Sequence, residues 1–182
     1  RAVAKTVTKG EMYYYNLQDA IKSVELNKKI VPSLTDNDYV VYAIRDFEAA
    51  YEIAIDKDAR VFIDLVGYTV STGEKFTNEG YLKVINSKNS SATLKPSVSI
   101  DNTGTLEIDN IKLISTTSSP TIKNSNILNI TNTLVEGGTG YGLENVGNGT
   151  IDIDSNTVLK SGNGYGLLNS GNKLVIDDGT II

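Results

Sequence analysis

Three aspartates offer the acid chemistry that this sequence can supply. Asp109, Asp154 and Asp177 each follow an apolar–x–apolar triplet, and Thr131 stands at the same place in a further copy of the pattern. Glycoside hydrolysis needs two carboxylates about 5–10 Å apart, so Asp154 and Asp177, in successive copies, are the candidate catalytic pair. Two such acids could instead hold a calcium ion. A structural interpretation is also open, in which an acid or a threonine here ends a strand and bonds the turn backbone.

Two tyrosines are the second feature with chemical potential. Tyr141 and Tyr165 lie in two eight-residue segments, 138–145 and 162–169, that are identical at six positions. Such a repeat predicts that both rings lie on the same side of the fold. Tyrosine rings bordered by glycines can receive sugar rings, but stacked aromatic rings also stabilise a fold without any ligand. Tyr141 and Tyr165 are therefore candidate ligand-binding residues, and their exposure discriminates between the two interpretations.

Composition argues against several classes of site and partner. The 182 residues include no His and no Cys, which removes the usual base at neutral pH and the common zinc ligands. The net charge is −5, which argues against nucleic acid and anionic lipid as partners because both favour a basic surface. No apolar run is long enough to span a bilayer. We therefore assign no metal site and no cofactor, and we expect no membrane insertion.

A repeat of about 21–24 residues positions these side chains. The second apolar residues of successive triplets are Val84, Ile108, Ile130, Ile153 and Ile176. An asparagine precedes each triplet, at Asn78, Asn102, Asn124, Asn145 and Asn169. A further apolar site follows the triplets, for which we take Leu113, Leu134, Val158 and Ile181. Fixed periods of this length are typical of solenoids.

The repeat predicts an all-β fold, a right-handed single-stranded parallel β-helix with a short N-terminal capping helix. Leucine-rich repeats share the period, but they need leucines at more positions and often a helix in each repeat. These repeats carry short strands of alternating apolar residues separated by Gly, Asn, Ser and Thr. The aligned asparagines should form a ladder of amides that bond from one turn to the next.

The N-terminal third lacks the repeat. Residues 1–12 are expected to be a flexible segment, and residues 13–60 a cap made of a short helix and the first strands. Apolar residues at helical spacing indicate the helix over residues 16–24, with Asn16 as its N-cap. Residues 29–34 could form the first strand, whereas residues 39–54 fit either a strand or a helical turn. Residues 61–182 are assigned to the turns of the β-helix, and the strand-like end at Ile182 suggests a truncated piece of a longer polypeptide.

The chain resembles the pectate-lyase-like β-helix proteins. Residues 15–21 resemble their N-terminal capping helix, residues 61–71 the strand and turn that follow it, and residues 141–145 a later turn. The closest likeness is to adhesin-like repeat proteins on the surface of Gram-positive and gut bacteria. It covers residues 13–182, with a poor match over 39–54. Lyases of this group are expected to use an Arg or Lys base beside acidic calcium ligands, and no Arg follows Arg60, so a lyase is not predicted.

We therefore expect a non-catalytic bacterial module that is secreted or attached to the cell surface, as an adhesin-like unit or a stalk. Its possible partners are a glycan or a host surface protein. The alternatives are a carbohydrate-active enzyme, which would use Asp154 and Asp177, and a carbohydrate-binding module, which would use Tyr141 and Tyr165. The architecture alone does not decide, since one fold hosts many functions.

Overall fold

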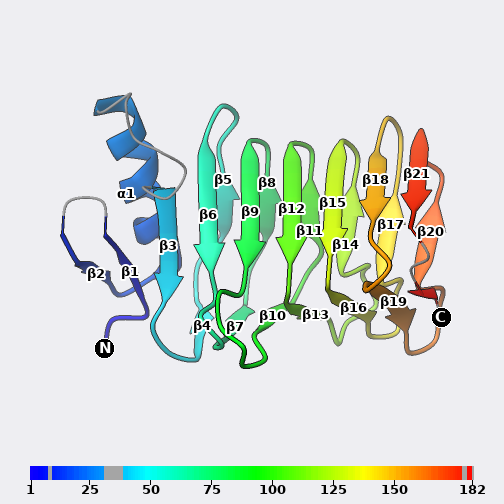
Figure 1. Cartoon of the computed structure of the whole chain (residues 1–182), viewed down its shortest axis with the longest axis horizontal. Coiled ribbons are helices and arrows are strands. Elements are labelled where there is room, and N and C mark those ends of the chain that lie inside the picture. The colour runs from blue at the N-terminus through cyan, green and yellow to red at the C-terminus, as the bar shows by residue number, and fades with distance from the viewer. Residues whose placement is uncertain (8–9, 31–38, 178–179, 182) are drawn as a thin grey trace.

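The chain folds into a parallel β-solenoid of about six turns with one helix near its N-terminus. The computed structural model describes residues 1–7, 10–30, 39–177 and 180–181. Figure 1 shows the turns side by side along the long axis, from helix α1 at one end to β20 and β21 at the other. The predicted fold class is confirmed.

Three sheets form the walls of the solenoid. Sheet 1 has nine strands in the order β2 (Met12–Tyr14), β1 (Ala4–Thr6), β3 (Val40–Ala43), β6 (Arg60–Asp64), β9 (Tyr81–Ile85), β12 (Thr105–Asp109), β15 (Ile127–Thr131), β18 (Thr150–Ile153) and β21 (Lys173–Ile176). Sheet 2 has seven: β4 (Phe47–Ala49), β7 (Thr69–Thr72), β10 (Thr93–Pro96), β13 (Lys112–Ile114), β16 (Leu134–Gly137), β19 (Val158–Ser161) and β22 (Thr180–Ile181). Sheet 3 has six: β5 (Ile53–Ile55), β8 (Phe76–Asn78), β11 (Ile100–Asn102), β14 (Ile122–Asn124), β17 (Leu143–Asn145) and β20 (Leu167–Asn169).

Each turn of the chain visits sheets 1, 2 and 3 in that order, which creates three corners. The first corner joins sheet 1 to sheet 2, the second joins sheet 2 to sheet 3, and the third returns the chain to sheet 1. Strands of successive turns pair in parallel, and Ile108 lies between Val84 and Ile130 in sheet 1. Ile153 and Ile176 continue the same row, so the predicted alignment of the triplets is confirmed.

The core is a set of apolar columns that run along the solenoid. Leu82, Leu106 and Leu128 form one column, and all three side chains are fully buried. Alternate residues of a strand face opposite sides of its sheet, so each triplet sends two side chains inward. Burial of one such side chain contributes about 1.5–3 kcal/mol. Each turn depends for this burial on the turns beside it.

Helix α1 (Leu17–Ile30) covers the N-terminal end of the core, as predicted. Asn16 caps it, since its Oδ1 accepts a hydrogen bond of 2.7 Å from the backbone N–H of Asp19. The buried face of the helix consists of Leu17, Ala20, Ile21 and Val24. The Gln18 side chain both donates to and accepts from the backbone of Ala54, at 3.0 Å each. That amide occupies backbone groups at the exposed edge of sheet 3.

The solenoid begins one turn earlier than the sequence suggested. Strands β3, β4 and β5 pair in parallel with β6, β7 and β8, so residues 40–55 form the first turn. Phe47–Ala49 is a strand rather than part of a helical turn. Residues 29 and 30 belong to α1 instead of a strand, and residues 31–34 of that predicted strand lie outside the described residues.

The N-terminal segment, for which flexibility stays a prediction, contributes strands to sheet 1. Strand β1 pairs antiparallel with β3 on one side and with β2 on the other, so sheet 1 is extended by a small hairpin. The Lys5 ammonium lies 2.6 Å from the Glu11 carboxylate, which also accepts a hydrogen bond of 2.5 Å from the Tyr13 hydroxyl. The hydrogen bonds from Lys5 and Tyr13 lower the pKa of Glu11 below its ordinary value of 4.5.

One predicted core column is displaced by a residue. Leu113 pairs with Val135, which pairs with Leu159, and all three are buried. Leu134 and Val158, which we aligned with Leu113, instead lie on the outer side of sheet 2 and are only partly buried. A shift of one residue along a strand moves a side chain to the opposite face. Leu134 and Leu159 are each adjacent to another aliphatic residue, so the sequence pattern alone fitted either register.

Candidate functional site

The asparagines before the triplets form the predicted ladder at the third corner. The Nδ2 atom of each donates to the Oδ1 atom of the next, from Asn78 through Asn102, Asn124 and Asn145 to Asn169, over 2.7–2.8 Å. The first four are buried and Asn169 is exposed. The ladder is therefore confirmed, and its buried amides hold the turns together.

The amides of the ladder also bond the backbone of the third corner. Asn78 donates to the carbonyl of Thr105, and Asn102 donates to that of Ile127. At the N-terminal end, the Oδ1 atom of Asn78 is buried and accepts no hydrogen bond from the described residues. Its neighbour in the first turn is Ile55, whose side chain has no hydrogen-bond donor. The ladder thus begins at a buried oxygen without a partner.

The aspartates after the triplets lie at the first corner, where they accept hydrogen bonds. Asp109 Oδ1 accepts from the hydroxyl of Thr131 at 2.9 Å and from the amide of Asn132 at 3.2 Å. Asp154 Oδ1 accepts from the hydroxyl of Thr157 at 2.6 Å and from the backbone N–H of Asn132 at 3.1 Å. These contacts agree with the structural interpretation of this position.

Asp154 and Asp177 follow residues that pair in adjacent turns, Ile153 and Ile176. Asp177 is exposed, and the chain beyond it to residue 179 lies outside the described residues. Among the described residues, no three His, Cys, Asp or Glu side chains are grouped so that they could hold a metal ion. A catalytic role for this pair stays a prediction.

Tyr141 and Tyr165 stack on each other at the second corner, as the repeat predicted. Their ring centroids lie 6.2 Å apart and their planes differ by 9°. Tyr165 is 69% exposed, and Tyr141 is partly buried. The two rings border a hollow of about 490 Å³ whose other lining residues include Ser118, Thr139 and Asn163.

Close stacking of the turns fixes this tyrosine pair. A Cβ atom on Gly140 would collide with the backbone oxygens of Ser118 and Ser119 in the preceding turn. The hydroxyl of Ser161 donates to the carbonyl of Gly140 at 2.5 Å and accepts from the N–H of Gly164 at 2.9 Å. Gly140 is therefore required by the close approach of two backbones beside Tyr141.

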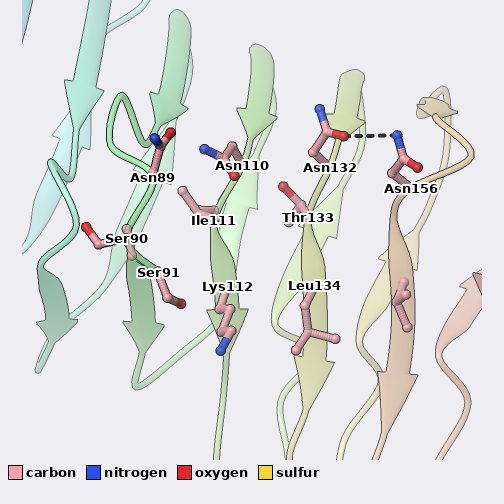
Figure 2. A pocket seen from close by; sticks show the side chains of 12 residues that line it. Asn89, Ser90, Ser91, Asn110, Ile111, Lys112, Asn132, Thr133, Leu134 and Asn156 are labelled. Carbon is pink, nitrogen blue, oxygen red and sulfur yellow. Dashed lines mark hydrogen bonds between the residues drawn. The ribbon is translucent and has the colours of Figure 1, made fainter.

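A second hollow, not predicted from the sequence, runs along the first corner (Figure 2). This groove has a volume of about 420 Å³, and its lining comes from four successive turns. Asn110, Asn132 and Asn156 project from neighbouring turns, and Asn156 Nδ2 donates to Asn132 Oδ1 at 3.0 Å. All three are exposed. Their spacing in the sequence matches the repeat, which was the signal available for finding them.

The groove is mostly uncharged. Asn89, Ser90, Ser91 and Thr133 add further amide and hydroxyl groups to its lining, and Lys112 is its one charged residue among those the structure describes. Asn110 and Asn132 have φ angles of 58° and 49°, a conformation that asparagine tolerates better than most residues. This conformation turns the chain from sheet 1 into sheet 2 within two residues.

Comparisons with known proteins find no match for this chain among family models, curated proteins or solved structures. The structure supports a parallel β-solenoid, while the likeness to pectate-lyase-like and adhesin-like proteins is carried by the sequence motifs alone. Within the part of the chain that is described, no helix has both the length and the apolar character needed to cross a membrane.

Proposed function

We propose that this chain is a non-catalytic module of a bacterial cell-surface or secreted protein, of the adhesin-like type within the pectate-lyase-like group, and that it contacts polysaccharide. It acts outside the cell. The motifs shared with that group support the family and the location, and the regular stacking of turns suits a scaffold that presents a long surface.

The exposure of the tyrosine pair is the observation that carries this proposal. Tyr165 is 69% exposed and stacks on Tyr141 beside a hollow with hydroxyl and amide groups. Tyrosine combines a broad apolar ring with a polar hydroxyl group, which suits the mixed surface of a sugar. A pair that served only to stabilise the core would be covered. Exposure therefore favours a binding role over a purely structural one.

The alternative is a carbohydrate-active enzyme that uses Asp154 and Asp177. The register of the two acids in adjacent turns supports this alternative. Against it, Asp154 Oδ1 already accepts two hydrogen bonds, one from Thr157 in its own turn and one from Asn132 in the preceding turn. We therefore place the enzyme second.

One experiment separates these functions. The protein is incubated with plant, mucin and bacterial polysaccharides, with and without calcium, and both retention on the glycan and new reducing ends are measured. Retention without new reducing ends is the expected result. New reducing ends that disappear in Asp154→Asn would establish the enzyme instead. Absence of both signals would leave a passive stalk or a module that binds a host protein.

A pair of variants locates the contact. Tyr165→Ala should weaken retention at least tenfold, because it removes the exposed ring. Tyr51→Ala is the matched control, since Tyr51 is 63% exposed on the first turn, away from the pair. Equal retention by both variants would show that the tyrosine pair does not make the contact.

A further inference from the structure

The exposed amides of the first corner carry one further inference, which rests on the proposed function and names the ligand more closely. We propose that the groove of Asn110, Asn132 and Asn156 binds an uncharged polysaccharide whose chain runs parallel to the solenoid axis. The groove lies at the first corner, where the strands of sheet 2 begin. The tyrosine pair lies at the second corner, where these strands end.

The length and direction of the groove follow from the stacking of the turns (Figure 2). Its lining begins with Asn89 in one turn and ends with Asn156 and Val158 three turns later. Successive turns are separated by about 4.8 Å, so the groove extends for about 14 Å along the axis. Four successive turns line the groove, so we match it with probes of four sugar units.

The amides are fixed before any ligand arrives. Asn132 is held at three atoms: its Oδ1 accepts from Asn156, its Nδ2 donates to Asp109 and its backbone N–H donates to Asp154. Asn110 donates to the carbonyl of Asn86 at 2.9 Å. Groups that are already ordered lose little entropy on binding. Each amide keeps one N–H or one lone pair for an external partner, and sugar hydroxyls can accept or donate to either.

The surroundings of the groove favour a neutral ligand over an acidic one. The carboxylates of Asp109 and Asp154 touch Asn132 directly, so a carboxylate-bearing sugar would meet two like charges. Lys112 is exposed at the rim and offers one compensating charge. Leu134 and Val158 add apolar surface on the same lining, which suits the C–H face of a neutral sugar. Selectivity therefore comes from repulsion of acidic chains as well as from the amides.

The test uses calorimetric titration with cellotetraose, mannotetraose and xylotetraose as neutral probes and tetragalacturonate as the acidic probe. The groove variant is Asn110→Gly with Asn132→Gly, because glycine accepts the positive φ angles at both positions. Asn148→Gly is the matched control, since Asn148 is exposed at the third corner. Thermal unfolding of each variant checks that the fold is kept.

The expected result is saturable binding of at least one neutral tetrasaccharide, weakened tenfold or more in the groove variant and unchanged in Asn148→Gly. Affinity should rise from the disaccharide to the tetrasaccharide and should change little with salt. Equal binding by the groove variant, or binding of tetragalacturonate alone, overturns the inference. So does failure of all three neutral probes.

The two proposals fail in different ways. If Tyr165→Ala loses retention on polysaccharide while the groove variant keeps it, the proposed function stands and the groove inference is overturned. If the unmodified protein is retained on no polysaccharide and binds none of the probes, both are overturned.

Discussion

Two rows of asparagine run along this solenoid, and they differ in what surrounds them. At the third corner the first four amides of the ladder are buried, and successive amides bond one another at 2.7–2.8 Å. At the first corner Asn110, Asn132 and Asn156 are exposed, and one amide–amide bond of 3.0 Å joins two of them. Both rows repeat at the period of the turns, so spacing alone does not separate them.

The difference between the rows is a difference in unused hydrogen-bonding capacity. A buried amide must find its partners within the protein, because an unmet polar group there costs about 1–3 kcal/mol. An exposed amide has water as an alternative partner, so a ligand can replace that water. We infer that the buried row serves stability and that the exposed row is available for recognition.

The largest expected effect is the loss of one buried amide. Asn124→Ala should destabilise the fold by about 2–4 kcal/mol, because it removes the acceptor of Asn102 and the donor to Asn145 at a fully buried position. Chemical denaturation followed by circular dichroism measures the change. A loss below about 0.5 kcal/mol would contradict the structural role given to the ladder.

The end of the ladder provides a sharper test. Ile55→Asn places a donor beside the unpartnered Oδ1 of Asn78, whereas Ile130→Asn places an amide in an apolar column. Both isoleucines are buried. We expect Ile55→Asn to cost about 2 kcal/mol less than Ile130→Asn, because only the first gains a buried hydrogen bond. Chemical denaturation of both variants measures the loss in the free energy of unfolding. Equal losses would mean that burying an amide has the same cost whether or not it can join the ladder.

The exposed row should contribute little to stability. Asn132→Gly removes an exposed amide at a position whose φ of 49° glycine accepts. We expect a change within about 1 kcal/mol in the free energy of unfolding. A loss as large as that of Asn124→Ala would erase the distinction between the two rows.

The smallest effect concerns acid. Neither row of amides titrates, so pH should act elsewhere, including at the N-terminal hairpin. The pKa of Glu11 is lowered in the folded state by its bonds to Lys5 and Tyr13, so this stabilisation is present above pH 4.5 and is lost as the pH falls through the lowered value. Hydrogen exchange of the β1 and β2 amides should speed up at low pH. Lys5→Gln should remove most of that pH dependence while leaving the ladder strands unchanged.

The sequence was most informative where a polar or aromatic residue marked the repeat. The ladder and the tyrosine pair were found because each of these residues keeps a constant place relative to the apolar triplets or the glycines of the repeat. The register predicted for Leu134 and Val158 was wrong because each is adjacent to another aliphatic residue, Val135 or Leu159, which occupies the buried column instead. The first turn was missed because β3 to β5 lack a ladder asparagine, with Ile55 in its place.

The groove was missed for a different reason. Asn110, Asn132 and Asn156 recur in the sequence at unequal spacings, because the first corner gains one residue before Asn156. Its contacts depend on which side chains adjacent turns bring together, as in the bond from Asn132 to Asp109. The sequence repeat predicts the spacing of the turns, but it does not show which corner is exposed to solvent.

The direction of the ladder has a consequence for how such a protein changes in length over evolution. Each amide donates its N–H to the asparagine of the next turn and offers its oxygen to the asparagine of the preceding turn. Every turn of the ladder therefore presents the same donor and the same acceptor to its neighbours. A duplicated segment of one period would find both partners ready without a compensating substitution. Insertion or deletion of whole turns between Asn78 and Asn169 should therefore be tolerated far better than insertion of half a turn.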